Sequence, residues 1–396
     1  MPPTQPSASS ARALTFAAYI SFVPIGMVTV LLGPMLPILS SRWALNYSQA
    51  GALFTAQYIA STCAVAVSGY IASRWGFRLA ISCGLVLTTV ALSLLLSGSH
   101  AFGVFCISLY GFGQGVSVPA ANLLVAELNP TRRSATLNLL NFFWSVGAVS
   151  CPFLVATASR FHHIGVFLGF VAAVSLAVAV GIMLLPLQRH DDPSAGGLQL
   201  IHWSALVHTR AFLVLSVLFF LYVGTENAFG GWIASYSKSL GSLAPAFALV
   251  TPSFFYAALT VGRVLAPFLL RAFTELTLAR VGLLLACCGM AGLMFSHSVV
   301  AVIASACLAG VGLSHVYPIT IALLSSCFGS ASTRTASIMF VLSNIGGGLL
   351  PWIVGVTSNR VGSLTAGLLV PFLGGAFMLL LYVGFWSKDS EGIAAS

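Results

Sequence analysis

The sequence predicts an all-α polytopic membrane protein with twelve transmembrane helices in two parallel repeats of six, and three observations support this fold. Of the 396 residues, 58% are hydrophobic and only 6% are charged, with a mean hydropathy of +1.01. A soluble domain of ordinary composition has about 25% charged residues. Apolar segments long enough to cross a bilayer recur along the whole chain, and its two halves share a pattern of glycines and prolines. This composition excludes a water-soluble enzyme and a disordered protein.

The apolar segments predict the helices in order. The predicted spans are 14–40, 49–73, 79–98, 101–126, 134–157, 165–187, 211–237, 247–270, 278–296, 299–326, 334–358 and 364–386. The one long polar connection, 188–210, separates an N-terminal six-helix bundle at 14–187 from a C-terminal one at 211–387. Short tails at 1–13 and 388–396 complete the chain.

Five glycines and prolines of the first half have an identical residue 199 positions later. The pairs are Gly111–Gly310, Gly113–Gly312, Pro119–Pro318, Gly147–Gly346 and Pro152–Pro351. One constant offset over five positions indicates two parallel copies of a six-span unit. In transporters built from such repeats, the substrate binds near the midplane between the halves, and alternating access comes from rocking one half against the other.

The basic residues predict the orientation of the chain. With the N-terminus inside, eleven Lys and Arg residues fall on the cytoplasmic side and four on the outside. This asymmetry places both termini in the cytoplasm, in a multi-pass protein of the cell (inner) membrane. The net charge of +9 comes from basic residues scattered singly, whereas a nucleic-acid-binding protein gathers them in a patch or stripe. We therefore expect the lipid bilayer, and no nucleic acid, as a partner.

A short motif between spans 2 and 3 carries a resemblance. The segment from Gly69 to Arg78, GYIASRWGFR, resembles the signature G-x-x-x-D-R-x-G-R-R of the major facilitator superfamily, with Ser73 in place of the Asp and Phe77 in place of one Arg. The segment GRVLAPFLLR, 262–271, looks like its degenerate second copy. The resemblance implies the major facilitator fold and a cytoplasmic gate. The expected gate residues are Gly69, Arg74, Gly76, Arg78, Glu127, Arg132, Arg133 and Arg263.

Within that superfamily the chain is similar to the fucose–galactose–glucose/proton symporter family. The similarity rests on PAANLLVAELNPTRRSATLNLLNFFWSVGA, YVGTENAFGGW, YPITIALLSSCFG and NIGGGLLPWIVG. It implies proton-coupled sugar transport by a monomer, with no bound cofactor and a proton gradient as the energy source. Some members carry a proton-linked Asp in span 1 and a Glu in span 4, where this chain has Gly33 and Val118.

Two charged residues, Glu226 and Arg263, lie well inside predicted spans. Ionisable groups inside a membrane are expensive to bury, and they usually mark a functional site. Burial disfavours the ionised form of a carboxyl group, so Glu226 is the predicted proton carrier or the main acceptor for solute hydroxyls. The alternative is a fixed ion pair between Glu226 and Arg263, or a permanently protonated Glu226.

Amide and aromatic side chains on central spans predict a polar cavity. Amides both donate and accept hydrogen bonds, as recognition of a neutral polyol requires, although each could instead join two helices. Asn138, Asn141 and Ser145 share one face of span 5. His315 is a possible proton relay, although a lone histidine is more often a packing residue. The predicted substrate-binding residues are Gln57, Asn122, Asn138, Asn141, Trp144, Glu226, Asn227, Trp232, Tyr236, His315 and Asn344.

These observations predict a secondary active transporter that moves a small neutral polar solute, a hexose in the first instance, by proton symport. The alternative is a proton-coupled efflux pump for amphipathic compounds. The sequence contains no recognisable catalytic constellation or metal-ligand spacing, so neither an enzymatic reaction nor a metal site is expected.

Overall fold

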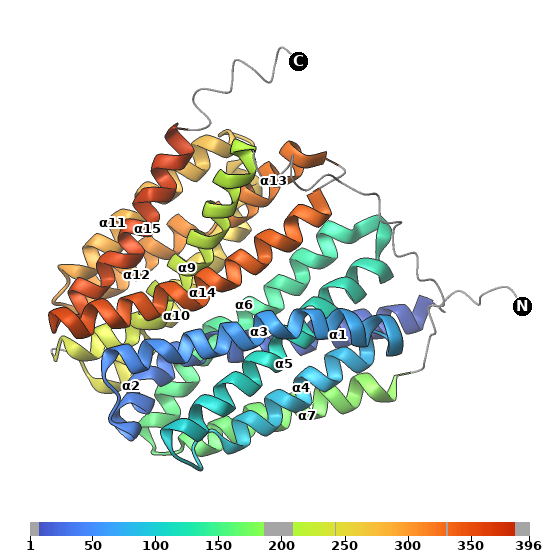
Figure 1. Ribbon diagram of the computed structural model, residues 1–396, viewed down its shortest axis with the longest axis horizontal. Coiled ribbons are helices and arrows are strands. Elements are labelled where there is room, and N and C mark those ends of the chain that lie inside the picture. Colours follow the sequence, from blue (N-terminus) through green and yellow to red (C-terminus); the bar gives the residue numbers. More distant parts are fainter. Residues whose placement is uncertain (1–7, 186–208, 242, 330–331, 385–396) are drawn as a thin grey trace, which may run out of the picture. The chain divides into compact units, whose positions relative to one another are not determined.

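The computed structural model describes residues 8–185, 209–241, 243–329 and 332–384. Every regular element in these ranges is a helix (Figure 1). Twelve of the described segments are long and apolar enough to cross a membrane, and the prediction of a twelve-span, all-α fold is confirmed. Most of the central connection 188–210 and of the two predicted tails lies outside the described residues.

The chain forms two compact units. The first contains α1 (Ala8–Val30), α3 (Tyr47–Trp75) from residue 56 onward, α4 (Phe77–Leu94), α5 (His100–Leu128), the short 3-10 helix η1 (Pro130–Arg132), α6 (Arg133–Arg160) and α7 (Ile164–Leu184). The second contains α2 (Leu32–Trp43), α3 up to Thr55, α9 (Arg210–Ser239), α10 (Pro245–Leu269), α11 (Glu275–Met294), α12 (Val299–Leu313), α13 (Val316–Phe328), α14 (Ser332–Val361) and α15 (Leu364–Gly384).

The segment 32–55 lies in the second unit, although the chain order places it in the N-terminal bundle. Its first helix, α2, packs against α9 and α10. In the same segment, the Thr55 hydroxyl donates a hydrogen bond to the Gly348 carbonyl at 3.0 Å. Membership of a unit is therefore set by which helix faces meet, and not by position along the chain.

Two predicted spans are interrupted in the structure. The expected span 14–40 is divided at Leu31 into α1 and α2, and α1 already begins at Ala8, inside the predicted tail. The expected span 299–326 is divided into α12 and α13 at Ser314–His315. A proline follows each break by three or four residues, at Pro34 and Pro318. Because proline has no N–H group and its ring crowds the preceding turn, it weakens the helix at these points.

The helices pair in the same way in both halves. In the first unit α1 packs on α6, and α4 packs on α5 and α7. In the second unit the corresponding pairs are α9 with α14, and α11 with α12 and α15. α9 and α14 run side by side in Figure 1. This shared arrangement confirms the two parallel repeats.

Helix starts repeat as well. Ser99 caps α5 by accepting a hydrogen bond from the Phe102 amide. Ser298, 199 residues later, caps α12 by accepting one from the Ala301 amide. A serine at this position satisfies one of the amide groups that the first helical turn leaves unpaired. The fourth span therefore begins at equivalent places in both halves.

The repeated glycines lie where helices cross at short range. A Cβ atom placed on Gly147 of α6 would overlap the backbone carbonyl of Val23 on α1. The equivalent Gly346 of α14 is equally close to the carbonyl of Phe220 on α9. Gly111, Gly113, Gly310 and Gly312 make similar backbone contacts. Small residues at these crossings allow close van der Waals packing, which drives helix association where lipid removes the usual hydrophobic driving force.

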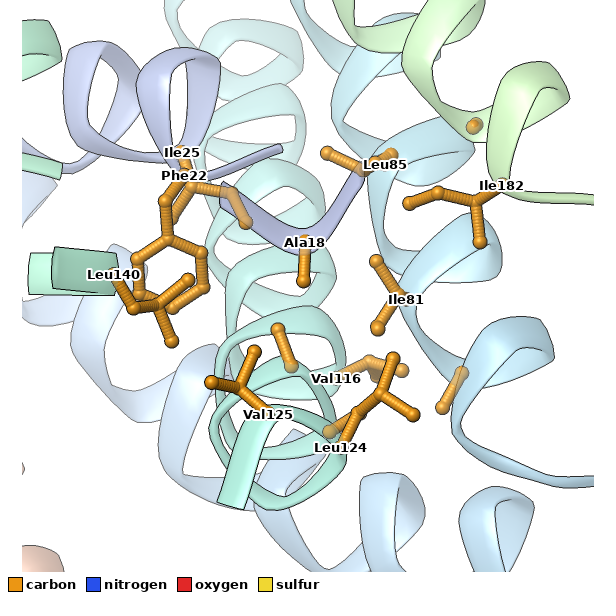
Figure 2. Close-up of a cluster of buried hydrophobic side chains, with 14 of the residues drawn as sticks. Ala18, Phe22, Ile25, Ile81, Leu85, Val116, Leu124, Val125, Leu140 and Ile182 are labelled. Atoms are coloured by element: carbon orange, nitrogen blue, oxygen red, sulfur yellow. The ribbon is translucent and has the colours of Figure 1, made fainter. Parts of the chain in front are cut away.

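The apolar core of the first unit shows how its helices interlock. Figure 2 shows side chains from α1, α4, α5, α6 and α7 meeting in one cluster. Its labelled members are Ala18, Phe22, Ile25, Ile81, Leu85, Val116, Leu124, Val125, Leu140 and Ile182. The mixture of small and branched side chains lets neighbouring helices interdigitate.

We predict that a single added methyl group at either repeated crossing destabilises the protein. Gly147→Ala and Gly346→Ala should each lower the free energy of unfolding by about 1–3 kcal/mol, the usual cost of overpacking. The measurement is the thermal unfolding midpoint of purified protein in detergent. Gly169→Ala on α7 is the matched control, because no atom lies within 4 Å of its added Cβ. Equal midpoints for all three variants would contradict the prediction.

Candidate functional site

An ion pair within the membrane-spanning helices of the second unit is the first candidate site. Glu226 lies near the middle of the 30-residue α9. Its Oε2 is 3.6 Å from Nη2 of Arg263 on α10, and this is the one ion pair within the described residues. The Glu226 side chain is 13% exposed and that of Arg263 is 26% exposed. The pair therefore neutralises both charges while leaving each side chain partly accessible.

Two tyrosines extend this ion pair. Arg263 Nη2 donates a hydrogen bond of 3.4 Å to the hydroxyl of Tyr222, which lies one helical turn before Glu226 on α9. The ring of Tyr222 stacks on the ring of Tyr317 from α13, with centroids 5.1 Å apart. Among the described residues, the polar groups gathered around the ion pair thus come from α9, α10 and α13.

A buried amide network in the first unit is the second candidate site. Gln57 on α3 donates to Oε1 of Gln114 on α5 at 3.3 Å. Gln114 in turn donates to the Thr29 hydroxyl on α1 at 3.1 Å. Trp144 on α6 donates its indole N–H to the same hydroxyl at 3.3 Å, and the Tyr110 hydroxyl donates to Oε1 of Gln57 at 3.4 Å. Four helices are thereby joined through polar atoms.

This network is almost closed to solvent. Gln57 is 3% exposed, Gln114 is 7% exposed and Tyr110 is 1% exposed. Its amide groups already have partners inside the unit. In this conformation the network therefore joins helices, and a solute could bind to it only by replacing hydrogen bonds that exist.

Most of the predicted asparagines turn back onto their own helices. The side-chain amides of Asn122, Asn141 and Asn227 each donate to the backbone carbonyl four residues earlier, at 2.8–2.9 Å. Asn138 is exposed and Asn344 is partly buried.

Two of the predicted aromatic residues are packed inside the second unit. Trp232 is 1% exposed, and its indole N–H donates to the Pro351 carbonyl at 2.9 Å. Tyr236 is 2% exposed, and its hydroxyl donates to the Met294 carbonyl at 3.1 Å. Neither ring presents an open face for a sugar in this conformation. Trp144, by contrast, is only partly buried.

His315 occupies the break between α12 and α13. Its Nδ1 is 2.7 Å from the hydroxyl of Ser314, and the side chain is 3% exposed. The ring lies close to Gly282 of α11, where an added Cβ would come within 3.0 Å of it. The histidine thus fills the space beside the interrupted helix.

The signature segment between spans 2 and 3 forms a tight turn, and one of its arginines, Arg78, is hydrogen-bonded to another helix. Gly76 precedes α4 with φ of 89°, a backbone conformation that glycine adopts without strain. Arg78 follows it and donates to the carbonyl of Ile182 at 3.0 Å and to that of Met183 at 2.6 Å. Arg78 thereby binds the carbonyls at the end of α7.

The second repeat contains a similar contact between an arginine and the end of a helix. Arg280, near the start of α11, donates to the Tyr382 carbonyl at 2.9 Å and 3.2 Å. Tyr382 is 199 residues after Met183, so the two arginines bind equivalent helix ends. The last carbonyls of a helix have no partner within it, and the helix dipole favours a positive charge there.

Of the remaining residues predicted to form a gate, all but the half-buried Arg263 lie at exposed positions. The Arg74 guanidinium is 5.5 Å from the centre of the Trp75 ring and donates to the Tyr70 hydroxyl at 3.3 Å. Gly69 and Arg132 are also exposed. Glu127 and Arg133 line an open pocket of about 370 Å³, whose remaining lining residues are Leu123, Ala126 and Pro130.

The sequence reasoning missed some of the polar groups that these sites contain. Tyr222 was detectable because it precedes Glu226 by four residues and so shares its helix face. Thr29 and Tyr110 gave no comparable signal, because their partners come from other helices. Glu226 and Arg263 lie on different helices and meet at 3.6 Å, as the ion-pair alternative predicted.

A known protein family matches most of the chain. The sequence model of the Major Facilitator Superfamily matches residues 18–351. The chain belongs to this superfamily. The solved structures with the same fold include transporters of nucleosides and of D-xylose, and these are not enzymes.

Two relatives carry names that point to different functions, sugar transport and drug resistance. The chain is 20% identical to sodium-dependent glucose transporter 1A of Mus musculus over 86% of this chain and 89% of that protein. It is 27% identical to the quinolone resistance protein NorA of Staphylococcus aureus, but over only 43% of this chain and 42% of that protein.

Solved structures show the same fold. A D-xylose-proton symporter gives a TM-score of 0.78 at 17% identity, over 94% of this chain and 97% of that chain. The nucleoside transporter NupG gives 0.71 at 14% identity, over 96% and 99%. The E. coli fucose:proton symporter FucP gives 0.63 at 20% identity, over 93% and 97%. At these identities the likeness establishes the fold alone.

We predict strong energetic coupling between Gln57 and Gln114. Replacing either one by Leu leaves buried hydrogen-bonding groups without partners, which should cost about 1–3 kcal/mol of unfolding free energy. The double variant should lose less than the sum of the two single variants, because it removes both sides of the 3.3 Å bond. Thermal unfolding of the four proteins in detergent measures the coupling. Additive losses would show that the two amides act independently.

Proposed function

We propose that this chain carries a small neutral polar solute, a hexose in the first instance, by proton symport with alternating access. The observation that carries the proposal is Glu226, an ionisable carboxyl group in the middle of α9 that keeps part of its surface accessible. Charged residues inside membrane helices commonly mark ion and substrate pathways. Glu226 is the proposed proton carrier.

The contacts of Glu226 suit a group that changes its charge state. Its bond to Arg263 is a long one, at 3.6 Å, and is not bidentate. A proton on Glu226 would weaken this attraction, and its loss would restore it. The ion pair thus supplies two states that differ in charge at one place in the membrane, as proton coupling requires.

The proposed solute class rests on the polar groups and on the relatives. Amides, hydroxyls and indole N–H groups are gathered in the network around Gln57 and Gln114, and they would bond to sugar hydroxyls where a solute replaces their present hydrogen bonds. The mouse relative is described as a glucose transporter, and two structural neighbours as sugar–proton symporters. We further propose the cell (inner) membrane as the location, cytoplasmic termini, a monomer, and the proton gradient as energy source without a bound cofactor.

The test uses purified protein in proteoliposomes. We expect saturable counterflow of labelled glucose, galactose, mannose or fucose, and accumulation of the same sugar when an inward proton gradient is imposed. Glu226→Gln should keep counterflow but lose gradient-driven accumulation, because counterflow needs no net proton movement. Glu275→Gln is the control, since Glu275 is an exposed acidic residue in the first turn of α11.

Glu226→Gln also leaves Arg263 without its ion-pair partner, which can itself destabilise the fold. The double variant Glu226→Gln/Arg263→Gln restores the charge balance and separates the two effects. Gradient-driven accumulation that survives in either variant would remove Glu226 from the coupling step.

A proton-coupled efflux pump for amphipathic compounds is the second candidate function. The partial match to the quinolone resistance protein favours it. Expression in a strain lacking its own pumps distinguishes the two functions. Raised resistance to several unrelated amphipathic compounds, together with no counterflow of any hexose by folded protein, would replace symport with efflux.

A further inference from the structure

Three exposed side chains gather where α3 ends. Tyr70 and Trp75 are 55% and 54% exposed, and their rings meet edge to face with centroids 5.6 Å apart. Arg74, also exposed, contacts both of them. Its guanidinium carbon is 5.5 Å from the centre of the Trp75 ring, and its Nη1 donates to the Tyr70 hydroxyl at 3.3 Å. The two aromatic residues therefore fix the position of the arginine at the surface.

Arg74 has no carboxylate partner within the described residues, where the one ion pair joins Glu226 to Arg263. Ser73 occupies the position at which the superfamily signature has an aspartate. The Ser73 hydroxyl donates to the Tyr70 carbonyl at 3.0 Å, and it has no charge to offer the neighbouring arginine. The positive charge of Arg74 is thus available to an anion from outside the described chain.

One complete donor edge of this guanidinium is free. A guanidinium has two edges with paired donors, Nη1–Nη2 at its end and Nε–Nη2 along its side. The bond to Tyr70 uses Nη1, and the contact with Trp75 uses no N–H donor. Arg78 uses its own Nε and Nη2 to bind two carbonyls, whereas no described residue is bonded to that edge of Arg74. Two parallel donors of this kind match two oxygens of a phosphate.

The free edge lies at a membrane boundary. Arg74 and Trp75 are the last two residues of the membrane-spanning segment Tyr47–Trp75. Tryptophan and tyrosine are enriched at the level of the lipid headgroups. The surrounding surface is not covered by the described chain, because a Cβ atom added at Gly69 or Gly76 would have no atom within 4 Å. A lipid headgroup is therefore the anion that this position favours.

The second half contains a related pair at the end of its own second span. The guanidinium carbon of Arg271 is 5.5 Å from the centre of the Phe268 ring, which is 59% exposed, just where α10 ends. Arg271 is not at the 199-residue offset from Arg74. Because the arrangement recurs without the same aligned residues, it favours a common role at the membrane interface.

We propose that Arg74 binds the phosphate of an anionic phospholipid, such as phosphatidylglycerol, on its Nε–Nη2 edge, with Tyr70 and Trp75 at the headgroup level. A choline lipid carries the same phosphate but adds a positive charge, which the guanidinium repels. The binding of this lipid does not depend on which solute the chain transports.

Native mass spectrometry of the full chain in detergent tests this site. Phosphatidylglycerol and phosphatidylcholine with the same acyl chains differ only in the headgroup. We expect the tightest-bound phosphatidylglycerol to have a Kd about tenfold lower than phosphatidylcholine, since bonds between two charged groups are stronger. Inorganic phosphate in excess should not displace the lipid, because it has no acyl chains to hold it at the protein surface.

Variants locate the site. Arg74→Gln should raise the Kd for phosphatidylglycerol about tenfold, to the value for phosphatidylcholine. Arg74→Lys should have a smaller effect, because lysine keeps the charge but lacks the fork. Trp75→Leu should raise this Kd about threefold through the lost cation–π contact. Arg132→Gln is the control and should leave the Kd nearly unchanged, since Arg132 is an exposed arginine predicted on the same side of the membrane.

Three results would overturn the proposal. Equal Kd values for the two lipids would show that headgroup charge is not recognised. Displacement by inorganic phosphate would assign the edge to a free anion. An equal loss in Arg74→Gln and Arg132→Gln would show a diffuse attraction between basic residues and anionic lipid. Thermal unfolding midpoints verify that each variant is folded, and should Arg74→Gln fail to fold, Arg74→Lys and the lipid pair on the unaltered protein still decide the question.

Discussion

The hydrocarbon interior of a membrane offers no hydrogen-bonding partner, and this constraint governs the whole chain. Backbone groups are satisfied by forming helices, which are the only regular elements of the described residues. Most polar side chains obey the same constraint by bonding to their own helix. Thr88 donates to Gly84 and Ser150 to Val146, at 2.9 Å and 2.6 Å, and the predicted asparagines on α5, α6 and α9 do likewise.

The polar groups that do not turn back onto their own helix are therefore the informative ones. In the first unit they include the network of Gln57 and Gln114, which joins four helices. In the second unit they include the pair of Glu226 and Arg263. The two halves share a scaffold but not these groups. Met27 occupies the position equivalent to Glu226, and Ala64 the position equivalent to Arg263. A repeat needs neither charge in order to pack, which is why we assign the pair to function.

Packing between the helices depends on glycine and on arginine. Repeated glycines let backbones approach until only a hydrogen atom fits between them, as at Gly147 and Gly346. Arg78 and Arg280 join the third span of each half to the end of its sixth. The first of these arginines belongs to the superfamily signature, and its contacts with α7 give that part of the motif a structural role within one bundle.

The sequence by itself determined the number of spans, their approximate limits and the two-repeat plan, because hydropathy and a constant 199-residue offset can be read directly from the order of residues. It also identified Glu226 and Arg263, since charges are rare in apolar segments. Only the tertiary structure decided that Glu226 meets Arg263, that Trp232 is buried against Pro351, and that residues 32–55 lie in the second unit. These contacts join residues far apart in the chain, and they depend on side-chain reach and helix crossing, which periodicity along a single helix does not encode.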